Sequence, residues 1–216
     1  MIHLQKEIEH IKKMTLSLSA VVEESVQKAV QAFEERDVKL ARRVINDDDQ
    51  IDEMEVEVEE ECLKILALHQ PVAIDLRFII AVLKINNDLE RIGDLAVNLA
   101  ERASVLASMQ KIQIPIDVKN MGLKVKGMLK KALDSLVNLD GNLAREVCAA
   151  DDEVDEIHRG MYEKVQSALE SNPRWLRPLV QLLAIPRYLE RIADHATNIA
   201  EDVIYMIEGQ IYRHVK

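Results

Sequence analysis

Four segments of the chain each carry two carboxylate side chains that are four residues apart. Positions i and i+4 are neighbours on the surface of a helix, with Cβ atoms about 5–6 Å apart. Like charges at that spacing destabilise an isolated helix, so four such pairs in matched places need an explanation. A bound cation is the simplest one, because carboxylates bind hard cations and also suit iron and manganese. The pairs are Asp48 and Asp52, Glu90 and Asp94, Asp151 and Asp155, and Glu190 and Asp194.

Two of these pairs lie within an internal duplication of the chain. Residues 76–101 align with residues 176–201 at a constant offset of 100, and half of the aligned positions are identical. A helical fold alone would preserve the apolar positions and leave the polar face free to vary. The retained polar residues therefore indicate chemistry or binding in two similar halves. They are Glu90/Glu190, Arg91/Arg191, Asp94/Asp194, Asn98/Asn198 and Glu101/Glu201.

Apolar residues recur every three or four positions through most of the chain, which is typical of amphipathic helices. We expect helices over residues 4–33, 38–45, 47–69 and 71–106 in the first half. In the second half we expect a helix after Pro115 that includes Val118 to Leu136, a short segment over 143–148 and a helix over 151–170. A break at 171–173 then precedes a last helix that runs to about Ile207. The pattern predicts an all-α fold of two tandem, pseudo-symmetric three-helix bundles, residues 1–111 and 112–216, with Ile112–Pro115 as the linker.

The expected topology brings the carboxylate pairs together. A short loop joins the second and third helices of each half, so these helices should be antiparallel, with the pairs at the same height. Each half then offers four carboxylates, enough for a metal cluster rather than a single ion. On the third helix these carboxylates lie nearly opposite the apolar stripe, so we expect a shallow surface site between helices. Gly93 and Ala193 leave room there for a ligand or another element. The competing interpretation is a charged face that is simply solvated.

Composition and short motifs exclude several classes of protein. The formal net charge of −10 argues against direct binding to nucleic acid or to anionic lipid. Cys62 and Cys148 form no metal motif or disulfide framework, so we expect buried, reduced thiols. The N-terminus lacks the apolar core of a signal peptide, and no apolar run is long enough to span a membrane. We therefore expect a cytoplasmic protein.

The sequence also lacks the usual signatures of an enzyme. It contains no glycine-rich phosphate loop, nucleophile elbow or Cys/His zinc spacing. His195 lies beside Asp194 but is replaced by Leu95 in the other half, which argues against an essential ligand there. Arg91 and Arg191 either pair with carboxylates or receive an anion. A two-metal phosphohydrolase and a metal-free helical scaffold stay open as alternatives to a metal-binding regulator.

Two segments carry a resemblance to a known family. ECLKILALHQPVAIDLRFIIAVLKINNDLERIGDLAVNLAERA (61–103) and YLERIADHATNIAEDVIYMIEG (188–209) strongly resemble the first and second halves of PhoU proteins. The resemblance covers essentially the whole chain, and the duplicated LERI[GA]D motif is its most specific part. It implies two three-helix bundles with multinuclear iron or zinc clusters at the E(D)xxxD motifs, which here are the four pairs named above.

The resemblance to the PhoU family also implies a function. It implies negative regulation of phosphate uptake and of the phosphate-starvation response, with no enzymatic activity. The implied partners are the ATPase of a phosphate ABC transporter and a phosphate-sensing histidine kinase. Contact with the inner face of the membrane would run through these partner proteins. We also expect a homodimer or a higher homo-oligomer.

Overall fold

The computed structural model describes residues 2–112 and 116–210, and every regular element within these ranges is helical. The first half contains α1 (Ile2–Glu35), α2 (Val38–Asn46), α3 (Asp48–His69) and α4 (Ala73–Ser108). The second half contains α5 (Val118–Asn138), α6 (Gly141–Arg159), α7 (Met161–Ser171), the 3₁₀ turn η1 (Pro173–Trp175), α8 (Leu176–Leu182) and α9 (Ala184–Glu208). The prediction of an all-α fold is confirmed.

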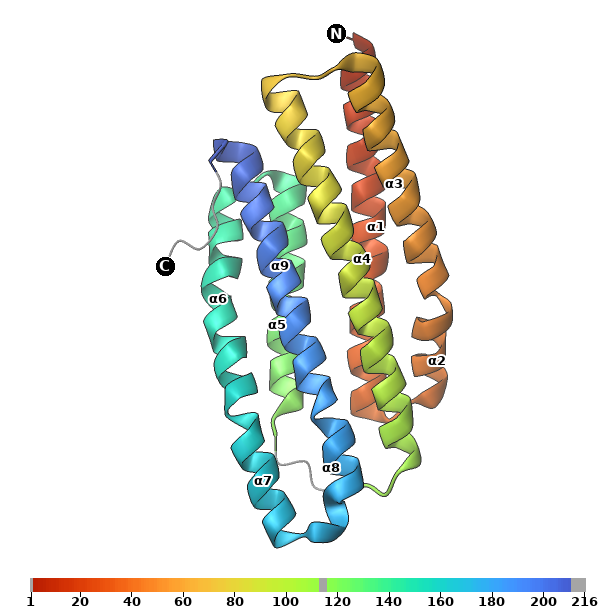
Figure 1. Cartoon of the computed structure of the whole chain (residues 1–216), viewed down its shortest axis with the longest axis vertical. Helices are drawn as coiled ribbons and strands as arrows, with labels where there is room; N and C mark the ends of the chain where they lie inside the picture. The colour runs from red at the N-terminus through yellow and green to blue at the C-terminus, as the bar shows by residue number, and fades with distance from the viewer. Residues whose placement is uncertain (1, 113–115, 211–216) are drawn as a thin grey trace.

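The short helices extend the long ones, so that each half is a bundle of three helical rods. Figure 1 shows α2 at the end of α3, α7 at the end of α6, and α8 at the end of α9. None of the described helices combines the length and apolarity that crossing a lipid bilayer requires. Most of the predicted linker, residues 113–115, lies outside the described residues, and the domain division at 111/112 stays a prediction.

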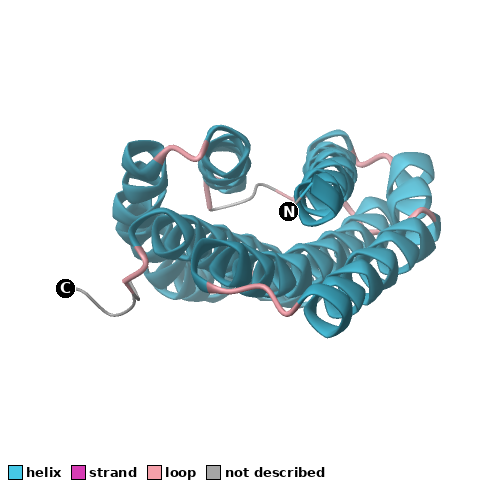
Figure 2. Cartoon of the chain, turned by 90° about the horizontal axis from the view of Figure 1, so that it is seen from above, coloured by secondary structure: helices cyan, strands magenta, loops and turns pink. Residues whose placement is uncertain are grey.

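The two halves meet along α4 and α9, which lie side by side and antiparallel in the middle of the molecule (Figure 1). Seen from above, the helices form a curved arrangement in which each half keeps its own bundle (Figure 2). Leu89 and Ile92 of α4 belong to the same buried apolar cluster as Leu189 and Ile192 of α9. The tandem repeats therefore share one continuous hydrophobic core, which fixes the position of one half against the other.

Equivalent turns begin the second rod of each half. Arg36 and Leu139 both adopt left-handed backbone conformations, with φ of 56° and 50°. The next residue in each case caps the following helix: Asp37 accepts hydrogen bonds from the amides of residues 39 and 40, and Asp140 from those of residues 142 and 143. An aspartate at this position satisfies amides that the first helical turn leaves unpaired. The predicted cap at Asp37 is therefore confirmed.

The second rod is broken at different places in the two halves, and the sequence explains why. In the first half the helix stops at Asn46 and restarts at Asp48, whereas α6 runs without interruption through the equivalent Ala149 and Ala150. Asparagine and aspartate favour turns and caps, while alanine is the best helix former. The predicted separate segment over residues 143–148 is therefore wrong. The second-half break lies instead at Gly160, between α6 and α7.

The last rod is also interrupted, although we predicted one helix from the break at 171–173 to about Ile207. It begins with η1 and α8, and α9 starts only after Leu183. Pro186 explains the interruption, because a proline ring clashes with the carbonyl group four residues earlier, and proline has no amide hydrogen to donate to it. The equivalent residue of the first half is Asn86, and α4 runs through it unbroken.

Candidate metal centre

In the second half, carboxylates from two helices converge on one point. Asp151 and Asp155 lie on α6, and Glu190 and Asp194 lie on α9. One carboxylate oxygen from each of Asp155, Glu190 and Asp194 lies within 4.8 Å of the other two. Burial, followed by repulsion from Asp194 and Asp155, raises the pKa of Asp151 to about 6. The tertiary structure therefore brings all four predicted carboxylates of this half into one cluster, which we call the second-half cluster.

The first half carries the corresponding first-half cluster between α3 and α4. Burial is the largest cause that raises the pKa of Asp48 to about 6, and the charges of Asp52, Asp94 and Glu90 raise it further. Burial and the charge of Asp94 likewise raise the pKa of Glu90. All four predicted residues of this half therefore repel one another at short range. Repulsion of this kind is relieved by protonation or by a bound cation.

Gly93 allows the two helices of the first-half cluster to approach each other closely. A Cβ atom at this position would lie 3.1 Å from Ile51 Cδ1 and 3.4 Å from Asp48 Oδ1. Even a methyl group would therefore press on a fully buried isoleucine side chain. The absence of a side chain at Gly93 therefore lets another element, α3, approach α4 closely, as we expected from the sequence.

Both clusters lie between helices at the surface, as we predicted, although some of their oxygens are buried. Asp52 and Asp194 are exposed, but the other six carboxylates are partly buried between helices. Asp48 Oδ1 and Asp151 Oδ1 are inaccessible to solvent and have no hydrogen-bond partner among the described residues. A buried carboxylate oxygen without a partner is costly, and a cation is the partner it suits best. The donor set therefore fits a metal ion that prefers oxygen ligands.

Arg91 belongs to the first-half cluster rather than standing apart from it. Its Nε lies 3.4 Å from Glu90 Oε2, and its Nη1 lies 3.4 Å from Asp94 Oδ2. Of the two alternatives left open by the sequence, these contacts favour pairing with carboxylates over receipt of an anion. The Arg91 side chain is half exposed, so its charge offsets the carboxylate repulsion only partly.

Polar contacts between α4 and α9 run between the two clusters, and the sequence did not predict them. His195 Nδ1 lies 2.7 Å from Asp88 Oδ1, and Asn198 donates to the same oxygen at 3.2 Å. Lys84 Nζ of α4 also lies 3.1 Å from Asp202 Oδ1 of α9. We call these contacts between α4 and α9 the polar seam. The repeat alignment points away from His195 because its equivalent is Leu95. Contacts that join two different halves leave no signal in a comparison of one half with the other.

The two cysteines form no disulfide, as expected. Cys62 is completely buried, and burial raises the pKa of its thiol to about 12. Cys148 is only half buried, and burial raises the pKa of its thiol to about 11. Neither thiol is therefore a reactive thiolate at neutral pH.

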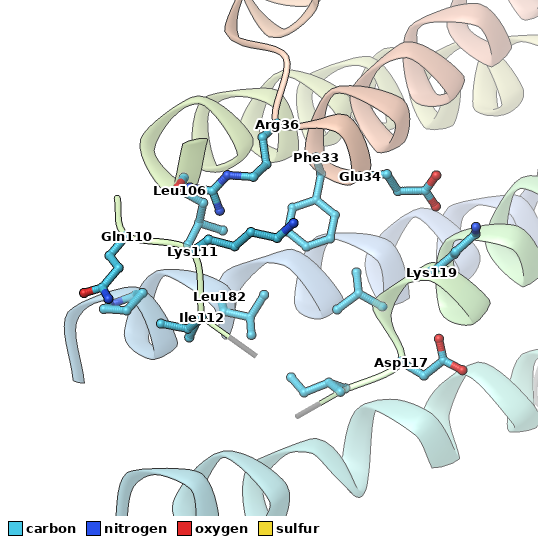
Figure 3. Close-up of a pocket in the computed structure, with 13 residues that line it drawn as sticks. Phe33, Glu34, Arg36, Leu106, Gln110, Lys111, Ile112, Asp117, Lys119 and Leu182 are labelled. Atoms are coloured by element: carbon cyan, nitrogen blue, oxygen red, sulfur yellow. Dashed lines mark hydrogen bonds between the residues drawn. The ribbon is translucent and has the colours of Figure 1, made fainter. Parts of the chain in front are cut away.

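A separate hollow of about 320 Å³ lies where the α1–α2 turn approaches the C-terminal end of α4 (Figure 3). Its position is set by Arg36, whose Nη2 donates to the carbonyl oxygens of Leu106, Ala107 and Met109 at 2.6, 3.2 and 2.6 Å. The carbonyl groups at the end of a helix lack partners within the helix, and here that of Leu106 also accepts a hydrogen bond from the amide of Met109 at 3.1 Å. The hollow shares no residue with either carboxylate cluster, and besides Arg36 its polar lining contains Glu34, Gln110, Lys111, Asp117 and Lys119.

Fold and site together define a duplicated, all-helical protein with one acidic cluster in each half. The family model of the PhoU domain matches this chain twice, over residues 15–103 and 118–203. The chain therefore belongs to the PhoU family.

Known proteins resemble this chain along its whole length. The "Phosphate-specific transport system accessory protein PhoU homolog" of Aquifex aeolicus is 39% identical over 211 residues, which cover 98% of this chain and 96% of the relative. The crystal structure of PhoU from Pseudomonas aeruginosa matches with a TM-score of 0.92 at 38% identity, covering 95% of this chain and 99% of that one. The phosphate transport system regulatory protein PhoU from Streptococcus pneumoniae matches with a TM-score of 0.89 at 26% identity, covering 97% and 99%.

Proposed function

We propose that this protein is a non-enzymatic accessory regulator of phosphate-specific transport, which restrains phosphate uptake and the phosphate-starvation response when phosphate is plentiful. The observation that carries the proposal is the full-length similarity to the Aquifex aeolicus relative, whose name assigns it to a phosphate-specific transport system. The solved Streptococcus pneumoniae relative is named as a regulatory protein of phosphate transport. Fold alone does not determine function, so identity over nearly the whole chain matters here.

Bound transition-metal ions are the second part of this proposal. Eight carboxylates, four in each cluster, would hold them: Asp48, Asp52, Glu90, Asp94, Asp151, Asp155, Glu190 and Asp194. The convergent oxygens of Asp155, Glu190 and Asp194 and the unpaired buried oxygens of Asp48 and Asp151 support this assignment. Iron or zinc in multinuclear clusters would supply positive charge to an otherwise acidic surface, which would then attract phosphate or acidic groups of partners.

The proposed partners are the ATPase of a phosphate ABC transporter and a phosphate-sensing histidine kinase, met at the cytoplasmic face of the membrane. Large exposed apolar side chains around the α3–α4 turn support contacts with protein partners. Leu68, Val72 and Ile74 are 67%, 73% and 68% exposed. Apolar groups gathered in this way on a surface mark protein interaction sites. A homodimer or higher homo-oligomer stays part of this proposal.

A starvation-promoter reporter in a deletion strain tests the regulatory function. The unmutated protein should restore repression in high phosphate. Glu90→Gln/Asp94→Asn and Glu190→Gln/Asp194→Asn should each weaken repression, because each removes two adjacent charged ligands from one cluster. Protein abundance and co-purification with the transporter ATPase and the kinase should be measured alongside.

Two controls make the reporter result decisive. Glu53→Gln/Glu57→Gln removes an exposed carboxylate pair with the same spacing on α3, and repression should be unchanged. Leu89→Asp puts a charge in the core and should abolish repression through unfolding. No repression by the unmutated protein, with its own transporter and kinase present, would overturn the regulatory proposal. Full repression by both cluster variants would show that the carboxylates are dispensable for regulation.

A further inference from the structure

The two carboxylate clusters are not chemically equivalent, and His158 is the main difference. On α6, His158 lies three residues after Asp155 and seven after Asp151, so the three side chains share one face of the helix. His158 Nδ1 lies 3.7 Å from Glu190 Oε1, an oxygen donor of the second-half cluster. Only 17% of the His158 side chain is exposed. The imidazole therefore lies at the edge of the second-half cluster, next to Glu190 but outside the group of Asp155, Glu190 and Asp194 whose oxygens lie within 4.8 Å of one another.

The first half has a different arrangement at the same place. The residue equivalent to His158 is Glu55, and Asn86 donates to both its backbone oxygen, at 2.9 Å, and its Oε1, at 3.1 Å. The residue equivalent to Asn86 in the second half is Pro186, which offers no side-chain amide. The two halves therefore differ at both positions of this contact. The first half uses Glu55 in a hydrogen bond between helices, whereas the second half leaves its histidine without that partner.

The second ring nitrogen of His158, Nε2, differs from Nδ1 because it pairs with no carboxylate in the described part of the chain. Nε2 is inaccessible to solvent and has no hydrogen-bond partner among the described residues. The His158 ring also contacts the ring of Tyr162, with centroids 6.0 Å apart and planes tilted by 48°, an aromatic contact that gives Nε2 no polar partner. Within residues 2–112 and 116–210, His158 is thus a largely buried imidazole with Glu190 as its one carboxylate neighbour and Nε2 without a partner, and metal binding is a common role of histidine.

We infer that His158 supplies a nitrogen donor to the second-half cluster and gives that site a preference for borderline ions such as zinc. This inference rests on the proposed metal binding of the clusters. Imidazole suits zinc, iron and nickel, whereas sites made of carboxylates alone suit manganese and magnesium. The first-half cluster, with oxygen donors and Glu55 engaged by Asn86, keeps the preference of an all-oxygen site. The two halves of the duplicated chain thus differ in how strongly they prefer zinc over manganese.

Zinc and manganese titrations of the full chain test the inference. The double substitution Glu90→Gln/Asp94→Asn removes metal binding at the first-half cluster. The affinity of the second-half cluster for zinc and for manganese is then measured by chelator competition. In that background His158→Gln should weaken zinc binding about tenfold or more, the size of effect that loss of a metal-site histidine contact has elsewhere. Manganese affinity should change less than threefold. His10→Gln, at an exposed histidine on α1, is the matched control and should change neither.

A measurement on the unmutated chain keeps the test independent of variant folding. Histidine ring ¹⁵N resonances should be followed as zinc is added, and one ring nitrogen of His158 should shift as its site fills. Unchanged zinc affinity in His158→Gln, together with an unshifted His158 ring, would overturn the inference and leave metal binding intact. No binding of zinc or manganese by the unmutated protein would instead overturn the proposed metal binding itself.

Discussion

The imidazole of His195 on α9 contacts the carboxylate of Asp88 on α4, with 2.7 Å between Nδ1 and Oδ1. Both side chains are largely buried, at 18% and 13% exposure, and they join the two halves of the molecule between the carboxylate clusters. An ionised carboxylate only accepts hydrogen bonds, so Nδ1 of His195 carries the hydrogen. Asn198 donates to the same oxygen of Asp88, which makes this carboxylate the centre of the polar seam.

Asp88→Ala should destabilise the protein by about 1–3 kcal/mol, because it leaves buried donors of His195 and Asn198 without their acceptor. Urea unfolding followed by circular dichroism measures the free energy of unfolding. Glu57→Gln, at an exposed position of α3, is the control and should stay within about 0.5 kcal/mol of the unmutated protein. Equal stability of the two variants would mean that the seam does not hold the halves together.

The metal-free protein should be more stable at pH 5 than at pH 7.5. The pKa values of Asp48 and Asp151 are raised from 3.8 to about 6 in the folded chain. Between pH 3.8 and 6 the folded state therefore binds more protons than the unfolded state, and stability falls as pH rises through this window. Allowing for the partial exposure of both carboxylates, the gain at low pH should be roughly 1–2 kcal/mol.

Urea midpoints measured in chelator at pH 5, 6 and 7.5 check this pH dependence. The double variant Asp48→Asn/Asp151→Asn removes the two carboxylates whose pKa is raised to about 6 and should make the profile less steep, while Glu90 and Asp194 still contribute. A stability that rises with pH in chelator would contradict the raised pKa values. With a saturating metal ion the trend should reverse, because deprotonated carboxylates bind the ion and the ion binds only the folded chain.

Asp94→Ala and Asp194→Ala should leave the metal-free protein folded and at least as stable as the unmutated chain. Desolvation by the neighbouring helices, followed by the charge of Glu190, raises the pKa of Asp194 although the residue is partly exposed to solvent, so removal of its charge relieves repulsion. With zinc or manganese present both variants should be less stable than the unmutated protein, because they lose metal-linked stabilisation. Thermal melts with chelator and with metal measure both effects. Unfolding of both variants in chelator would identify these residues as structural.

Gly93→Leu should destabilise the protein by about 1–3 kcal/mol, as overpacking of a tight core does. The new side chain would start 3.1 Å from Ile51 and would push α3 away from α4. Gly127→Leu on α5 is the matched control, since nothing lies within 4 Å of a Cβ atom there. This control should stabilise the chain by roughly 1 kcal/mol through helix propensity. Thermal and urea unfolding compare the two, and an equal gain in both would contradict close packing at Gly93.

The sequence alone determined the features that depend on local spacing. Apolar periodicity gave the helices, and Asp37 was recognisable as a helix cap. The four i, i+4 carboxylate pairs were visible because helix geometry relates sequence distance directly to spatial distance. Two errors were also local in origin. Ala149 and Ala150 carry α6 through the position where the first half breaks, and Pro186 interrupts the last helix. All three residues act on helix continuity through their own backbone preferences, because alanine favours a helix and proline interrupts it.

Tertiary structure decided what depends on packing between residues far apart in the chain. The contact of His195 with Asp88, the burial of Asp48 Oδ1 and the place of His158 beside Glu190 all join different helices. Sequence spacing carries no information on such distances, because the relative position of two helices is set by many weak apolar contacts summed over the shared core. The duplication predicted two equivalent clusters. Only the packed molecule revealed how the two clusters differ.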